Sequence, residues 1–89
     1  MKIIASAIKF QMKGSPYWNI LSGCRHCDVY EQMFHFGIIN KYNNDTKVEG
    51  FLTDKFEFLD RYEAVEYAKI AGQLKEDFSE NKLYSEDLW

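Results

Sequence analysis

The strongest constraint on the fold is a pattern that occurs twice: two β-prone stretches followed by a short helical stretch that ends at a glycine. The second helical stretch has the clearest start, because Asp60 can cap a helix and Glu63 stands three residues later, as in a capping box. Gly37 and Gly72 end the two stretches, as glycine commonly does after a helix. The order ββαββα predicts one small α+β domain, with a mainly antiparallel sheet and two helices on one face.

The β-prone stretches cover residues 1–11, 17–21, 47–53 and 56–59. We expect the first helix over about 27–36, where Val29, Met33 and Phe36 recur at the spacing of one helix face. Residues 40–46 are polar and include two adjacent asparagines, which favours a loop. Gly50 interrupts a strand without a side chain, so it indicates a bulge or a close approach by another group.

The chain of 89 residues fits a single domain, with a body over 1–73 and an acidic, aromatic tail over 74–89. The tail contains five acids against two lysines, but its apolar residues predict that it docks on the body. Aromatic residues make up 17% of the chain, enough for a core without metal or disulfides. We expect some of these aromatics to face a partner subunit, in a homo-oligomer, or to stack on a ligand.

The charge pattern excludes a general DNA or RNA binder. The net charge is −3, the basic residues are dispersed, and only Arg25 and Arg61 are arginines, whereas affinity for nucleic acid rests on clustered cations. No apolar stretch approaches the roughly 20 residues that span a bilayer, so no membrane partner is expected. We therefore expect a cytoplasmic protein whose cysteines are thiols.

The run from Gly23 to Asp28 concentrates the most chemistry, with Cys24, Arg25, His26 and Cys27 between them. A Cys-x-x-Cys pair before a helix is typical of thioredoxin-like redox sites, because a helix start lowers a thiol pKa. That fold also needs a proline facing the thiols from a later strand, and Pro16 precedes them. We therefore favour the interpretation that Cys24 and Cys27 are two incidental thiols over a role in redox catalysis.

Metal binding has weaker support than a simple structural role for the same residues. Cys24, Cys27, His26 and His35 are possible zinc ligands, but structural zinc usually takes two separated pairs. Several carboxylates are candidates for magnesium, although each suits a helix start or a solvated tail: Asp28, Asp60, Glu63, Glu86 and Asp87. We expect no metal and no cofactor.

An anion site is the favoured interpretation of the same run. Arg25 offers a planar fork of donors for phosphate, and His26 can donate or exchange a proton near neutral pH. Both stand at a helix start, where unpaired N–H groups also attract anions. Arg61 would bring a second guanidinium to the same ligand, and Asp28 would orient His26. The alternative is a solvated loop for Arg25 and His26, and a surface ion pair for Arg61.

Five motifs occur along the chain: Arg25-His26-x-Asp28, Gly50-Phe51-Leu52-Thr53, Phe58-Leu59-Asp60-Arg61-x-Glu63-Ala64, Ala71-Gly72-Gln73 and Leu83-Tyr84-Ser85-Glu86-Asp87-Leu88-Trp89. In combination these motifs resemble a family of small proteins of tailed phages and prophages, and the resemblance covers nearly the whole chain. It implies that the Arg-His-x-Asp motif is more important for function than the two cysteines. It also implies an accessory protein of the infected host cell, of the kind that acts against host defence.

The leading hypothesis is therefore a protein that binds a phosphorylated, nucleotide-like ligand and sequesters a host immune signal. Arg25, His26 and Arg61 would hold phosphate, and Tyr84 or Trp89 would cover a base. The first alternative is a phosphodiester or phosphoryl hydrolase with His26 as general acid and base, assisted by Asp28. The second is an inhibitor or adaptor that docks on a host protein without chemistry.

Overall fold

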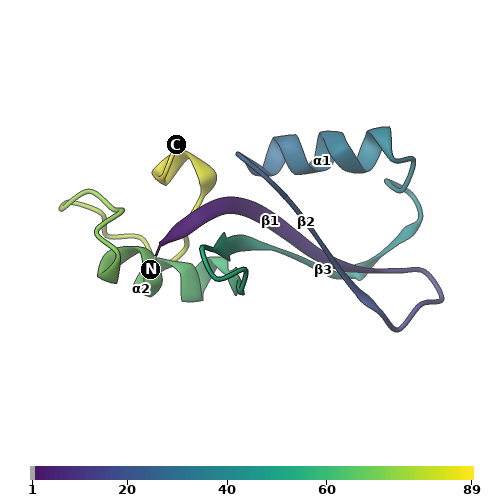
Figure 1. Cartoon of the computed structure of the whole chain (residues 1–89), viewed down its shortest axis with the longest axis horizontal. Helices are drawn as coiled ribbons and strands as arrows, with labels where there is room; N and C mark the ends of the chain where they lie inside the picture. The colour runs from purple at the N-terminus through teal and green to yellow at the C-terminus, as the bar shows by residue number, and fades with distance from the viewer. Residues whose placement is uncertain (1) are drawn as a thin grey trace.

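The computed structural model describes residues 2–89 and has the predicted order of strands and helices (Figure 1). It is an α+β domain in which two ββα units follow one another, and a short 3-10 turn, η1, lies in the tail. Within residues 2–89, no helix has the length and apolar character needed to cross a membrane. The elements are β1 (Ile3–Met12), β2 (Trp18–Gly23), α1 (His26–His35), β3 (Tyr42–Thr53), β4 (Phe58–Asp60), α2 (Arg61–Ile70) and η1 (Ser85–Asp87).

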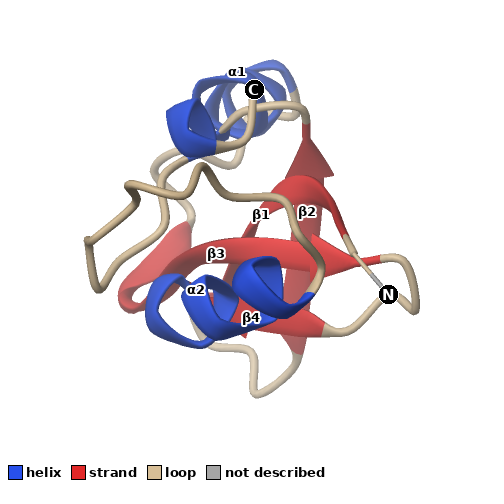
Figure 2. Cartoon of the chain, turned by 90° about the vertical axis from the view of Figure 1, so that its left-hand side faces the viewer, coloured by secondary structure: helices blue, strands red, loops and turns tan. Residues whose placement is uncertain are grey.

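The four strands form one antiparallel sheet in the order β2-β1-β3-β4. Alternate residues of β3 face the helices: Glu49 contacts Tyr30 of α1, and Phe51 packs in the cluster under α2. Both helices therefore cover the same face of the sheet, as predicted. The strands twist along their length, so α1 lies above them and α2 below them in Figure 1; Figure 2 shows the same arrangement from one end.

The core consists of two clusters, one under each helix. Ile8, Phe10, Val29 and Met33 form the cluster under α1. The cluster under α2 contains a residue of the tail, and its fully buried members are Ile3, Phe51, Ala64, Val65, Ala68 and Leu83. The predicted docking of the tail is therefore confirmed, because Leu83 is as buried as any core residue.

Several boundaries differ from the predictions, most clearly those of α1 and β3. Helix α1 begins one residue earlier and ends before Phe36, which is the C-cap and is 64% exposed, so this residue does not belong to the apolar face. Strand β3 begins at Tyr42, inside the predicted loop. The Thr46 hydroxyl accepts from the Gln11 N–H at 2.8 Å and donates to the Asn43 carbonyl at 2.6 Å, which holds this polar segment against β1.

Local signals gave correct predictions at the second helix and at the glycines. The Asp60 carboxylate accepts from the Glu63 N–H at 2.8 Å, and the Glu63 carboxylate accepts from the Asp60 N–H at 3.1 Å. Gly37 and Gly72 both have a φ of 71°, the left-handed conformation that ends a helix. At Gly50, a Cβ would lie 2.1 Å from the Leu59 carbonyl oxygen, so the expected close approach is made by the backbone of β4.

Candidate functional site

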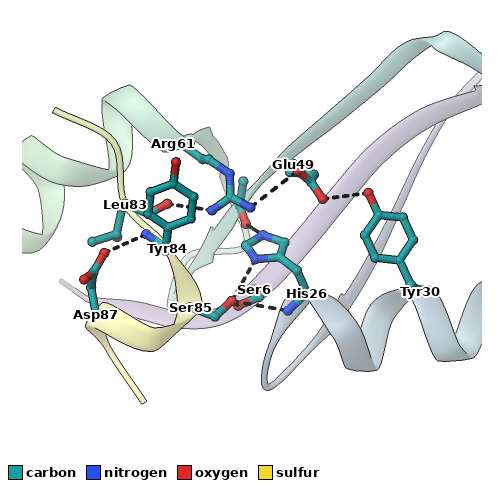
Figure 3. A network of polar contacts seen from close by, with 10 residues as sticks. Ser6, His26, Tyr30, Glu49, Arg61, Leu83, Tyr84, Ser85 and Asp87 are labelled. Atoms are coloured by element: carbon teal, nitrogen blue, oxygen red, sulfur yellow. Dashed lines mark hydrogen bonds and ion pairs between the residues drawn. The ribbon is translucent and has the colours of Figure 1, made fainter. Parts of the chain in front are cut away.

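His26 lies in the first turn of α1 and points inward to the sheet. It is 8% exposed, and its ring packs edge-on against Phe51 at a centroid distance of 5.2 Å. Its Nε2 is 2.7 Å from the Gly50 carbonyl oxygen, and its Nδ1 is 2.7 Å from the Ser85 Oγ (Figure 3). The imidazole therefore joins three distant parts of the chain, namely the start of α1, the middle of β3 and the tail.

The partners of the ring determine its protonation. A carbonyl oxygen only accepts, so Nε2 carries the hydrogen and Nδ1 accepts from the Ser85 hydroxyl. Ser85 in turn accepts from the His26 N–H at 3.2 Å and lies 2.7 Å from the Ser6 hydroxyl. Burial lowers the pKa of His26, and the nearby Arg61 guanidinium lowers it further, although the bond to the Gly50 carbonyl opposes this shift. At neutral pH the ring is thus uncharged, and both of its nitrogens have hydrogen-bond partners.

A serine hydroxyl bonded to a histidine nitrogen is also the arrangement of a nucleophile and its base. Here Ser85 is only 2% exposed and its oxygen contacts Ser6 and two atoms of His26. A substrate cannot reach this oxygen in the described fold. We interpret the pair as an internal anchor that attaches the tail to α1 and β1.

Both arginines hold the tail, at different points. The Arg25 Nη2 donates to the main-chain oxygen of Trp89. The Arg61 Nη1 donates to the Leu83 carbonyl at 2.7 Å, and its guanidinium stacks on the Tyr84 ring at 4.6 Å (Figure 3). Each guanidinium therefore has a partner within the chain.

Glu49 connects Arg61 to α1. Its carboxylate accepts from the Tyr30 hydroxyl at 2.6 Å and lies 3.4 Å from the Arg61 Nη2. Burial acts to raise the pKa of Glu49, but the bond from Tyr30 and the charge of Arg61 outweigh it, so this pKa lies below its usual value. Lys47, on the same strand, stands over the Tyr30 ring at 5.1 Å.

A shallow hollow of about 350 Å³ opens beside Arg61. It brings together cations from β3, from the start of α2 and from the tail, and Tyr62 is 55% exposed at its rim. The Lys82 ammonium lies 5.4 Å from the Tyr62 ring centroid. The lining residues are Lys47, Val48, Glu49, Asp60, Arg61, Tyr62 and Lys82.

The predicted site residues fall into two groups. Arg61 and Tyr84 meet, as a guanidinium stacked on a ring, and Arg61 lines the hollow. Arg25, His26 and Trp89 are not among the residues that line it. Among the described residues, no hydrogen bond joins Asp28 to the His26 ring. The Asp28 carboxylate instead accepts from the Arg25 N–H at 3.0 Å, so Asp28 caps α1.

Sequence reasoning missed Lys47, Lys82 and Ser85. The two lysines carry no local signal, because only the fold brings β3 and the tail to the same hollow. Ser85 lies within the motif Leu83-Tyr84-Ser85-Glu86-Asp87-Leu88-Trp89, and this position was the only sequence feature that pointed to a role for it.

Cys24 and Cys27 are exposed free thiols. In the part of the chain that the structure describes, no three or more His, Cys, Asp or Glu side chains are grouped so as to hold a metal ion.

Comparison with known proteins identifies the family. No match was found among curated proteins or among solved structures. The family model of the phage T4 y16D protein matches residues 2–89, which is nearly the whole chain. The chain therefore belongs to the phage T4 y16D protein family.

Proposed function

We propose that this phage protein binds a phosphorylated, nucleotide-like ligand in the hollow between β3, α2 and the tail. One observation carries the proposal: Lys47, Arg61 and Lys82, from three separate segments, line a single open hollow. Converging cations favour a phosphate, which accepts several charge-assisted hydrogen bonds at once.

Among the residues described, the lining carries three cations against two carboxylates, and both carboxylates are bonded within the chain. Glu49 is engaged by Tyr30 and Arg61, and Asp60 accepts from two N–H groups at the start of α2. Lys47 and Lys82 each stand over a tyrosine ring, and an ammonium has three donors, so both retain donors for a ligand.

Tyr62 gives the hollow a stacking surface. It is 55% exposed, and a base stacked on an aromatic side chain typically contributes about 1–3 kcal/mol to binding. A ligand with a phosphate and a planar base would contact the cations and Tyr62 together. Arg25 and His26 act indirectly in this proposal, since they hold the tail to which Lys82 belongs.

Binding without turnover is the form of the proposal that the geometry favours. Both nitrogens of His26 have partners, and the lining carboxylates are engaged within the chain. In an infected host cell, such a protein would lower the free concentration of a nucleotide signal, which is a counter-defence role.

Isothermal titration calorimetry with ADP, ADP-ribose and a cyclic dinucleotide tests the proposal, with inorganic phosphate as the smallest probe. We expect at least one nucleotide to bind, and Lys47→Gln and Lys82→Gln each to weaken its binding about tenfold, the effect of losing about 1.4 kcal/mol. Lys55→Gln is the matched control, because Lys55 is exposed in the turn before β4.

Three results would overturn the proposal. Wild-type protein that gives no heat with the whole panel has no such site. Unchanged affinity in both lysine variants places the site elsewhere. A ligand recovered as product after denaturation and chromatography identifies a hydrolase.

A further inference from the structure

Strand β2 is an edge of the sheet, with β1 on one side and no strand on the other among residues 2–89. The Gln11 N–H points to Thr46 of β3, so alternation along β1 directs the N–H groups of Ile8 and Phe10 to β2. Their partners on β2 are Leu21 and Asn19. The residues that alternate with these partners, Trp18 and Ile20, consequently present their N–H and C=O groups outward.

Both ends of this edge are closed by contacts within the chain. The Gln32 side chain donates to the Ser22 carbonyl at 2.9 Å, which confirms that Ser22 also points outward. At the other end Pro16 has no N–H, and its carbonyl accepts from the Gln11 side chain at 3.0 Å. The edge is therefore open for pairing at Trp18 and Ile20, between two closed positions.

The side chains of the open segment are unusually apolar for an edge strand. Tyr17 is 77% exposed, Trp18 is 51% exposed and Ile20 is 44% exposed. Edge strands are normally protected by charges, proline or a bulge, and residues 17–23 contain no charge and no proline.

We propose that β2 pairs with β2 of a second copy, antiparallel about a two-fold axis at Asn19. In this register Trp18 lies opposite Ile20 of the other copy and Ile20 opposite its Trp18, which completes four main-chain hydrogen bonds. Aromatic and β-branched residues are favourable cross-strand partners. Ser22 lies opposite Pro16 of the other copy, so the two closed positions meet each other and end the pairing.

Charge and area decide which partner fits. Residues 17–23 carry no charge, so two copies of β2 meet without repulsion between them, and a basic peptide would find no opposite charge there. The cation beside this edge is Lys9 of β1, whose ammonium lies 4.6 Å from the Trp18 ring centroid. With Tyr17 and Trp18 exposed at 77% and 51%, the two side chains offer roughly 200–300 Å² per copy. A standard interface buries about 800 Å² per partner, so we expect a weak dimer with a dissociation constant on the order of 100 μM.

Sedimentation velocity over a concentration series tests the association. The weight-average mass should rise from 10.6 kDa towards twice that value as concentration increases to about 1 mM, at the expected dissociation constant. Ile20→Lys should move the midpoint at least tenfold higher. Ile4→Lys is the matched control, since Ile4 is 40% exposed on β1 and lies outside the β2 pairing.

Cysteine cross-linking tests the register. In a Cys24→Ser, Cys27→Ser background, Asn19→Cys should give a disulfide-linked dimer on oxidation, because the two positions form a close, non-hydrogen-bonded pair. Ser22→Cys should not, because it lies opposite Pro16. Circular dichroism checks that each variant is folded.

A wild-type monomer at 1 mM would overturn the inference. So would a dimer that persists in Ile20→Lys or dissociates equally in Ile4→Lys, or cross-linking at position 22 in preference to 19. The inference does not depend on the proposed ligand site, which lies at β3 and α2, away from this edge.

Discussion

At the residue scale, His26 links the stability of the fold to pH. Burial holds its pKa below the ordinary value of 6.5, so the folded state binds a proton less readily than the unfolded chain. The stabilisation is complete above the unfolded pKa and is lost as pH falls below 6.5 towards the folded pKa. We expect the urea concentration at the unfolding midpoint to decrease as the pH is lowered from 7.5 to 5.5. This range lies above the region where Glu49 titrates.

Two variants test whether His26 causes this change of the urea midpoint with pH. His26→Gln should be less stable at pH 7.5 by about 1–3 kcal/mol, from the loss of buried hydrogen bonds, and should show little change of midpoint across the same range. His35→Gln is the matched control, because His35 is an exposed histidine on α1. An unchanged slope in His26→Gln would contradict the assignment.

At the element scale, Gly50 allows β4 to approach β3. A Cβ at this position would meet the Leu59 carbonyl oxygen at 2.1 Å and the Phe58 ring at 2.6 Å, and a backbone atom cannot rotate away. Gly50→Ala should therefore destabilise the protein by about 3 kcal/mol or more in urea unfolding.

Gly23→Ala is the matched control for crowding. Its three nearest contacts would all be with side chains of α1, at 3.2 Å from Gln32, 3.3 Å from Asp28 and 3.4 Å from Val29, and none is as close as those at Gly50. We expect its midpoint to stay much closer to wild type. Equal losses in the two variants would show that β4 does not press on Gly50.

The elements were predictable where their signals are local. The capping box of Asp60 and Glu63 lies within one turn, so the sequence alone places the start of α2. The first part of β3 was missed because Thr46 is held by Gln11, 35 residues away. The same reason applies to the site: Arg61 was identified beside a helix start, but Lys82 reaches it only through the fold of the tail.

The prediction for His26, a ligand residue at a helix start, missed its burial for a related reason. Helix α1 begins one residue earlier than its apolar pattern suggests, so His26 lies in the first turn and points to the sheet. Its partner Ser85 is 59 residues away, and no local pattern pairs the two.

At the scale of the whole molecule, the tail connects two separate halves. The molecule is elongated, 43 × 22 × 22 Å, with one cluster under each helix. Leu83 packs in the cluster under α2, while Ser85, two residues later, bonds to His26 at the start of α1. The tail thus couples the halves through a few buried contacts.

Ser85→Ala tests this coupling. It removes the hydroxyl from the His26 Nδ1 and from the Ser6 Oγ, two buried groups that would be left without this partner, and should cost about 1–3 kcal/mol. Hydrogen exchange should show faster opening both in the tail and in the first turn of α1, because the Ser85 oxygen also accepts from the His26 N–H. Ser79→Ala, at an exposed tail position, should stay within about 0.5 kcal/mol of wild type. If faster exchange were confined to the tail, α1 would be stable without it, and the two halves would be coupled through β1 and β3 alone.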